Sequence, residues 1–398
     1  MNSKISAQSV SDKSVAIRGY LEGYYGKLLR WQEREQLISS LPSQRLNTYC
    51  YAPKEDTKHR LHWREPYDPE WYASFAQFCA LAQEHKVSIV AGIAPGLDFN
   101  FFDENGKSDF DRLLNKAKGL LANGADHILI LWDDIEESNY QHSNGLSEGA
   151  AHARIVNQLS ESLEQDIWVV PRVYAEEIND TNNYLGDFFS ELNEIHTVLL
   201  CGNAIVSNAI TPKDLQKLSG TINADSNCGA FSHRIVAWDN FYANDYCPRR
   251  LFAGPWVGRE TINDFLINPT GMPLTDSLLL DIAVSTHTSK HRQKDWADAL
   301  VRHGVPDIFH VLAPYFDSPF FGNRAVLENS SDTQCIETTE LVKQAIEHCL
   351  WKWKSPLARE WYPFIMSLKH DLALMGGNLP RDRVLKTQPA PLANRLLG

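Results

Sequence analysis

Short apolar runs alternate with amphipathic stretches over most of the chain. The apolar runs have the length and continuity of strands that are buried on both faces of a sheet. They predict strands over 15–21, 46–51, 87–94, 127–132, 167–170, 197–201, 235–238 and 278–284. The stretches between them carry apolar residues at helical spacing, over 31–41, 70–85, 108–122, 147–165, 181–193 and 212–219.

Strands that alternate with helices in this way favour an α/β fold, the (β/α)8 TIM barrel. An open, doubly wound sheet is the second choice. No G-x-G-x-x-G or Walker pattern follows any predicted strand, which removes the usual nucleotide-binding role of that sheet. Beyond 288 the strand pattern gives way to helical spacing over 290–303, 338–353 and 357–374. We therefore expect a polar leader at 1–13, a (β/α)8 barrel at 14–288, and a C-terminal helical region with a tail at 289–398.

The most informative strand end is the stretch HILILWDDIEES, which begins at His127. Here a buried apolar run leads directly into two adjacent carboxylates, Asp133 and Asp134. Barrels and doubly wound sheets carry their chemistry at the C-terminal ends of the strands, so the pair is a candidate catalytic site. An acid pair after a strand can also cap a helix or lie solvated in a loop, and only convergence with other strand ends favours catalysis.

Polar residues and glycines accompany the other predicted strands as well. The stretches after the strands are EGYYG (22–26), APK (52–54), PGLD (95–98), PRVY (171–174), GN (202–203), and DN (239–240) followed by NDY (244–246), and NP (268–269) precedes the eighth predicted strand. Each of these residues alone is an ordinary turn residue. Together around two acids and a Trp they favour a pocket for a polyhydroxylated ligand, because amides and carboxylates pair with hydroxyls. His59 and His62 lie too far from the acids in the sequence to indicate a metal site, and we expect neither a metal nor a cofactor.

Composition and charge limit the binding partners and the cellular location that the sequence predicts. The chain of 398 residues has a formal net charge of −12 and no basic stripe, which argues against a nucleic-acid partner. Its seven cysteines show no C-x-x-C spacing, which is typical of reduced thiols in a cytosolic protein. The N-terminus shows no secretory signal, and no run is apolar and long enough to span a membrane. We therefore expect a cytoplasmic protein with no membrane partner.

Longer blocks of the sequence resemble a known family. The blocks are EGYYG, LNTYCYAPKEDTKHR, HWREPY, APGLDF, LWDDI, AWDNFYANDY with RRLFAGP, and INP, in this order between Arg18 and His287. They are similar to the catalytic domain of glycoside hydrolase family 84, the β-N-acetylglucosaminidases that include the protein O-GlcNAcases. The long blocks APKEDTKHR and WDNFYANDY are specific to the family, whereas EGYYG or the acid pair alone would not identify it.

The resemblance implies a (β/α)8 barrel and a retaining, substrate-assisted hydrolysis of terminal β-linked N-acetylglucosamine (GlcNAc). It implies that Asp133 orients and polarises the acetamido group and that Asp134 is the general acid/base. It further implies contacts to the sugar or its acetamide for Gly23, Lys54, Tyr174, Asn240, Asp245 and Asn268, with Trp238 as a wall of the pocket. The substrate would be a GlcNAc-bearing glycoprotein, glycopeptide or oligosaccharide, and a homodimer through the C-terminal helices stays open.

Adjacent carboxylates suit this mechanism for a reason that does not depend on the resemblance. A retaining glycosidase with an enzyme nucleophile needs two carboxyls about 5–5.5 Å apart on opposite sides of the bond, which consecutive side chains reach with difficulty. Consecutive acids can instead serve the leaving oxygen and the neighbouring acetamide, whose oxygen attacks C1 to give an oxazoline. We expect one acid to be ionised at the acetamide N–H and the other, the general acid, to be protonated near neutral pH.

Two other functions stay open at this point. The chain could be a non-catalytic GlcNAc-binding protein on the same barrel, although the two intact acids argue against it. It could also be a metal-assisted hydrolase that uses the acids as ligands. The latter is the weakest choice, because no His or Cys stands at ligand spacing from the pair.

Overall fold

A computed structural model describes residues 15–101, 108–136, 146–179, 183–219, 233–320 and 340–375. The chain forms two compact units. The first comprises Met1–Ala243 with Val257–Pro273, and the second comprises Asn244–Trp256 with Leu274–Gly398. This division differs from the expected boundary at 288, because 244–256 and 274–288 fall in the second unit. The expected leader and the tail beyond 375 lie outside the described residues.

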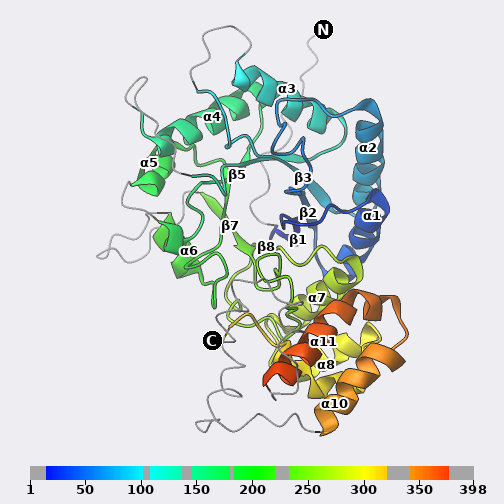
Figure 1. The fold of residues 1–398 in the computed structure, drawn as a ribbon. Helices are drawn as coiled ribbons and strands as arrows, with labels where there is room; N and C mark the ends of the chain where they lie inside the picture. Colours follow the sequence, from blue (N-terminus) through cyan, green and yellow to red (C-terminus); the bar gives the residue numbers. More distant parts are fainter. Residues whose placement is uncertain are drawn as a thin grey trace. The chain divides into compact units, whose positions relative to one another are not determined.

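The first unit is built around a closed barrel of parallel strands, which confirms the predicted fold class (Figure 1). The strands are β1 (Arg18–Glu22), β2 (Thr48–Tyr51), β3 (Ser88–Ile93), β4 (His127–Leu131), β5 (Trp168–Val170), β6 (Thr197–Leu200), β7 (Arg234–Asp239) and β8 (Phe265–Ile267). Each strand pairs with the next along the chain, and β1 pairs with β8 to close the barrel. All C-terminal strand ends therefore meet at one rim, where barrels of this kind place their functional residues.

Helices in the connections between strands lie outside the barrel (Figure 1). They are α1 (Trp31–Ser40), α2 (Pro69–Glu84), α3 (Asp109–Ala122), α4 (Glu148–Leu163), α5 (Tyr184–Glu191) and α6 (Pro212–Leu218). The helical patterns expected between the strands are confirmed, with ends shifted by a few residues. Capping explains where two of them begin. Ser108 accepts a hydrogen bond from Asp111 N before α3, and Thr211 forms a capping box with Asp214 before α6.

The eighth strand is not where the sequence pattern predicts it. The apolar run 278–284 lies in helix α7 (Pro273–Thr286), and the strand is Phe265–Ile267. An apolar run alone does not distinguish a strand from a helix that is buried on all sides, and the three consecutive leucines of α7 are all buried. With this correction Asn268 stands directly after β8, at the same kind of strand end as the other candidate residues.

The barrel interior is filled with apolar side chains. Leu21, Val90, Leu129 and Leu199 belong to one buried cluster contributed by different strands. Because the interior is apolar, the polar residues at the strand ends mark the rim as the place for a site.

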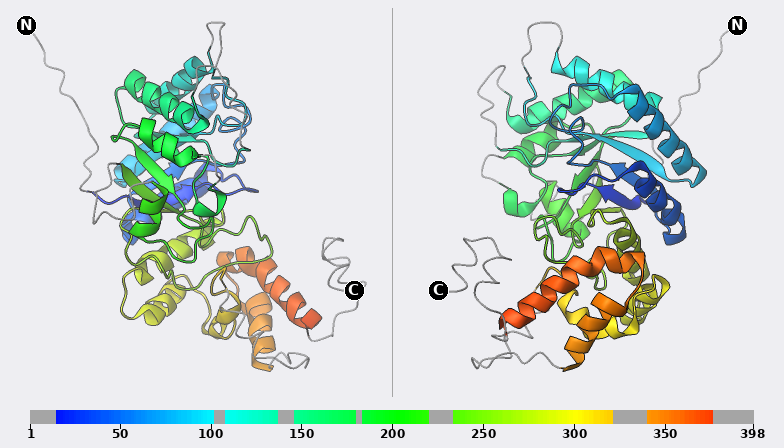
Figure 2. Two further views of the ribbon diagram at one scale, coloured as in Figure 1. Left: turned by 90° about the vertical axis from the view of Figure 1, so that its left-hand side faces the viewer. Right: turned by 45° about the vertical axis from the view of Figure 1, so that its right-hand side comes forward.

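The second unit consists mainly of helices (Figure 2). They are α7, α8 (Arg292–Arg302), α10 (Glu340–Glu347) and α11 (Pro356–Met375), and α10 continues into a π-helix at His348–Lys352. The helical predictions over 290–303, 338–353 and 357–374 are confirmed within the described residues. The buried Trp361 of α11 donates from Nε1 to Thr275 Oγ1 of α7 at 3.0 Å and ties the two helices together. None of the described helices has the length and hydropathy needed to cross a membrane.

Candidate active site

The two adjacent acids converge on one lysine near the C-terminal end of β4. Asp133 follows the strand closely and is only 4% exposed. Its Oδ2 accepts a hydrogen bond from Lys54 Nζ, which also lies 3.4 Å from Asp134 Oδ2. Consecutive side chains of an extended strand point to opposite faces, so this convergence requires a turn in the backbone.

The turn is at Asp134, whose φ of 53° lies in the left-handed region. That conformation costs a residue with a side chain on the order of 1–3 kcal/mol. The carbonyl oxygen of Asp134 accepts a hydrogen bond from Arg60 Nη2 at 2.7 Å. Because a hydrogen bond from a charged donor contributes about 1.5–3 kcal/mol, the contact offsets the strain that brings the two acids together.

Two tyrosine hydroxyls hold the carboxylate of Asp134. Tyr25 OH donates to Oδ2 at 2.7 Å, and Tyr174 OH donates to Oδ1 at 2.8 Å. Tyr25 follows β1 and Tyr174 follows β5, so side chains from three strand ends meet at this carboxyl. Lys54 Nζ lies 5.7 Å from the ring centre of Tyr25 and 6.0 Å from that of Trp238, which places the cation between aromatic faces.

These surroundings move the pKa values of the two acids in opposite directions. Burial raises the pKa of Asp133, and the charge of Asp134 adds to the increase, although Lys54 opposes it. Burial also acts against ionisation of Asp134, but Lys54 and the hydroxyls of Tyr25 and Tyr174 outweigh it and hold the pKa of Asp134 below its usual range. These directions are opposite to those that a protonated general acid at Asp134 needs, and the expected assignment of the proton to Asp134 stays a prediction.

One buried oxygen at the site has no hydrogen-bond partner among the described residues. Asp133 Oδ2 is bound to Lys54, whereas Oδ1 is buried and unpaired there. A buried polar atom without a partner is costly, so a native structure that keeps one calls for a functional explanation. Oδ1 of Asp133 is available to an N–H or O–H donor of a bound ligand.

A chain of amide hydrogen bonds links the ends of β1, β7 and β8. Gly23 N donates to Asn268 Oδ1 at 3.1 Å, and Asn268 Nδ2 donates to Asn240 Oδ1 at 2.9 Å. Trp238 Nε1 donates to the same Asn240 oxygen at 2.8 Å. A Cβ at Gly23 would lie 2.7 Å from Trp238 Cζ2, so the absence of a side chain lets the indole ring pack there. The four residues therefore form one interlocked wall.

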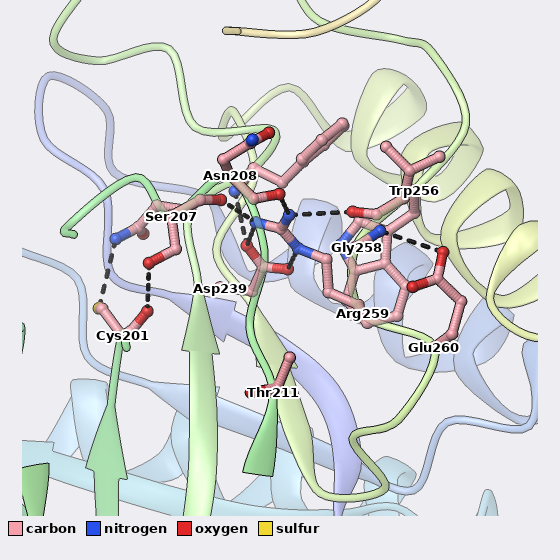
Figure 3. A network of polar contacts seen from close by, with 12 residues as sticks. Cys201, Ser207, Asn208, Thr211, Asp239, Trp256, Gly258, Arg259 and Glu260 are labelled. Atoms are coloured by element: carbon pink, nitrogen blue, oxygen red, sulfur yellow. Dashed lines mark hydrogen bonds and ion pairs between the residues drawn. The ribbon is translucent and has the colours of Figure 1, made fainter. Parts of the chain in front are cut away.

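Beside Asn240, a buried ion pair fixes the loop after β6 (Figure 3). Arg259 and Asp239 are both fully buried, and Arg259 Nε donates to Asp239 Oδ2 at 2.8 Å. The same guanidinium donates to the carbonyl oxygens of 207–208. Ile205 O, in the same loop, accepts a hydrogen bond from Asn240 Nδ2 at 2.8 Å. The ion pair thus supports the position of the Asn240 amide.

Eight of the predicted site residues, all in the first unit, fall into two contact groups. The first group is Asp133, Asp134, Lys54 and Tyr174, and the second is Gly23, Trp238, Asn240 and Asn268. The ring of Trp238 near Lys54 connects them. Asp245 lies in the second unit, and its contact with a sugar stays a prediction. Within the described ranges, no group of three His, Cys, Asp or Glu residues could hold a metal ion.

Sequence reasoning missed three residues that shape the site. Tyr25 and Arg60 stand inside the blocks EGYYG and APKEDTKHR, so a residue-by-residue reading of those blocks would have found them. Arg259 gives no such signal, because its partner Asp239 and the loop it holds lie far away in the sequence.

Comparisons with known proteins agree with this geometry. A model of the β-N-acetylglucosaminidase family matches residues 18–295. The protein O-GlcNAcases of Mus musculus and Rattus norvegicus are 31% and 30% identical to the chain over 251 residues, which is 61% of this chain. The chain spans about a quarter of the length of these relatives, 26%. In fold it is similar to a mutant O-GlcNAc hydrolase of Thermobaculum terrenum, with a TM-score of 0.73 and 21% identity over 96% of this chain and 88% of that one.

Proposed function

The chain belongs to the β-N-acetylglucosaminidase family, glycoside hydrolase family 84, and from this premise we propose that it is a retaining exo-β-N-acetylglucosaminidase. It removes terminal β-linked GlcNAc by substrate-assisted catalysis. The observation that carries the proposal is the convergence of Asp133 and Asp134 on Lys54 at the end of β4. Two carboxyls gathered in this way can serve a leaving oxygen and the acetamide next to it.

Asp133 receives the acetamide of the substrate. Its Oδ1, unpaired within the described residues, accepts a hydrogen bond from the acetamide N–H, while Lys54 on Oδ2 fixes the orientation of the carboxylate. This contact turns the acetamide oxygen toward C1, in the geometry that an attack needs. The negative charge of Asp133 also stabilises the positive charge that the acetamide gains as its oxygen attacks.

Asp134 is the general acid/base. In the first step the acetamide oxygen forms a bond to C1, the bond from C1 to the leaving oxygen breaks, and the carboxyl proton of Asp134 passes to that oxygen. In the second step water attacks C1, its proton passes to the Asp134 carboxylate, and the bond from C1 to the acetamide oxygen breaks. The products are an alcohol and GlcNAc of retained configuration, and Asp134 has regained its proton.

Substrate binding supplies the protonation state that this mechanism needs. The Asp134 side chain is 29% exposed. A bound sugar covers it and excludes water, which raises the pKa of Asp134. The acetamide N–H stabilises the carboxylate of Asp133, which lowers the pKa of that acid. Binding therefore favours the ionised form of Asp133 and the protonated form of Asp134.

Protein-linked GlcNAc is the substrate class to test first, because the relatives from mouse and rat carry the name protein O-GlcNAcase. Glycopeptides and oligosaccharides that end in the same sugar are the alternatives. A homodimer through the C-terminal helices stays a prediction.

Hydrolysis of 4-nitrophenyl β-N-acetylglucosaminide tests the proposal. We expect turnover, competitive inhibition by a thiazoline analogue of the oxazoline, and a loss of about 10²–10⁴ in kcat/KM for Asp133→Asn. Asp134→Asn should lose less on this substrate, because nitrophenol is a good leaving group that needs little protonation. Binding of GlcNAc without turnover would favour the non-catalytic binding protein instead. Activity that disappears with EDTA would favour the metal-assisted hydrolase.

A further inference from the structure

Arg60 contacts the main chain of the proposed general acid. Its side chain is buried, at 9% exposure, and Nη2 donates to the carbonyl oxygen of Asp134 at 2.7 Å. Nη1 is buried and has no hydrogen-bond partner in the described part of the chain. A buried cation with an unsatisfied donor is costly, and the stability of the fold does not explain why it is kept. The acceptor that it does use belongs to a residue with a left-handed backbone.

We propose that Arg60 is a positioning residue for the general acid/base: it holds the left-handed backbone of Asp134 and thereby aims the carboxyl at the leaving oxygen. The inference rests on the proposed function, in which Asp134 gives its proton to that oxygen.

The loop between β2 and α2 holds the acid pair at two points. Lys54, near its beginning, binds the side chain of Asp133, and Arg60, further along, binds the main chain of Asp134. One loop therefore sets the positions of both acids relative to each other. The two hydrogen bonds come from different side chains, so each can be removed by its own substitution.

The loop is itself fixed by buried contacts. Asp56 accepts hydrogen bonds from Tyr51 OH at 2.6 Å and from Tyr67 OH at 2.8 Å. Lys116 of α3 donates to three carbonyl oxygens of the loop. His59, the neighbour of Arg60, is hydrogen-bonded through Nδ1 to a carbonyl oxygen of β3 at 2.9 Å. Arg60 is therefore held in place independently of its contact with Asp134.

Orientation distinguishes this role from general support of the fold. A general acid works only when its proton lies within hydrogen-bond reach of the atom that receives it. Without Arg60 the backbone of Asp134 can return to a more common conformation. The carboxyl then keeps its hydrogen bonds with the two tyrosine hydroxyls but loses the fixed backbone that directs it at the leaving oxygen. The attack of the acetamide uses Asp133 and Lys54 and keeps its geometry. The loss therefore falls on substrates whose leaving group needs a proton.

The test compares the full chain with its Arg60→Met variant on two aryl β-N-acetylglucosaminides. One carries 2,4-dinitrophenol, which leaves without a proton, and the other carries unsubstituted phenol, which needs one. The measured quantity is the ratio of their kcat/KM values, in which the fraction of folded protein cancels. We expect the ratio to rise about tenfold in Arg60→Met, a part of the about 10²–10⁴ that a general acid contributes. A ratio equal to that of the wild type overturns the proposal.

Arg64→Met is the matched control. Arg64 belongs to the same loop but pairs with Asp98 and Asp109. The ratio of kcat/KM values for Arg64→Met should equal the wild-type ratio. If that ratio rises as much in Arg64→Met as in Arg60→Met, any damage to the loop has the same effect, and the proposal is overturned. Arg60→Lys keeps the charge without the planar fork, and its ratio should rise by a smaller factor. If Arg60→Met does not fold, the test uses Arg60→Lys. A raised ratio in that variant supports the proposal, and an unchanged ratio overturns it.

Asp134→Asn separates a failure of this inference from a failure of the proposed function. Its ratio should rise more than that of any Arg60 variant, because the proton donor itself is gone. If the ratio rises in Asp134→Asn but not in the Arg60 variants, only the positioning role fails. If it does not rise in Asp134→Asn, the assignment of Asp134 as the general acid fails, and the inference fails with it.

Discussion

Lys54 is the residue on which the charge state of the acid pair depends most directly. Its ammonium binds Asp133 and lies 3.4 Å from Asp134, and it lowers the pKa of both acids. Lys54→Met removes the charge and keeps much of the volume, so both pKa values rise. Asp133 must be ionised to hold the acetamide, so the acid limb of the kcat/KM profile moves to higher pH. We also expect kcat/KM near neutral pH to fall on the order of 10²-fold.

A second lysine of the same loop provides the control for this pH profile. Lys58 Nζ pairs with Asp68 at 2.9 Å and is not hydrogen-bonded to either acid. Lys58→Met should leave the acid limb where it is in the wild type. If Lys54→Met leaves the limb unmoved as well, the ammonium of Lys54 does not control the ionisation of the pair.

Among the elements, the loop after β6 depends on the ion pair at the end of β7. Asp239→Asn leaves the buried guanidinium of Arg259 without its charged partner. Breaking a buried pair in this way costs about 3–5 kcal/mol in the free energy of unfolding, which urea denaturation measures. The pair Arg154–Glu191 is the comparison, since its side chains are 53% and 35% exposed and Glu191→Gln should cost less than about 1 kcal/mol. If the two substitutions lower the free energy of unfolding equally, burial does not explain why the Arg259–Asp239 pair matters more than the exposed pair.

The order of elements was predictable where each element carries its own pattern. The strand β4 is an unbroken apolar run, and α3 has apolar residues at helical spacing behind a Ser cap. β8 was missed because three residues show no periodicity. α7 was mistaken for a strand because its three consecutive leucines form an apolar run without helical spacing. Register and closure of the barrel follow from how the strands pair in space.

The site was predictable to the extent that strand ends identify it. Lys54 and Tyr174 were found because they follow predicted strands, and both contact the acid pair. The reversed order of the two pKa values was not predictable, because it depends on the hydroxyl of Tyr25 and on the different burial of the two acids. The contact and the burial arise only when the strand ends come together at the rim, so no local sequence pattern predicts them.

At the scale of the whole molecule, the two acids affect the free energy of unfolding in opposite ways. The pKa of Asp133 is raised by folding, so its contribution to stability decreases as the pH rises above the pKa of the unfolded chain. The pKa of Asp134 is lowered by folding, so its contribution is present above the unfolded pKa and is lost as the pH falls through the folded pKa. Of the two carboxylates, that of Asp134 is therefore the one whose ionisation the fold favours near neutral pH.

This contrast predicts unequal effects of two substitutions that differ by one position. Asparagine resembles a neutral carboxyl, so Asp134→Asn, which removes the carboxylate whose ionisation the fold favours, should lower the free energy of unfolding at pH 7 by more than Asp133→Asn. Toward about pH 2 both acids approach the protonated state, and the two variants should approach the wild type. Guanidinium denaturation at both pH values, followed by tryptophan fluorescence, measures the differences. A larger loss for Asp133→Asn than for Asp134→Asn at pH 7 would contradict the opposite directions of the two pKa shifts.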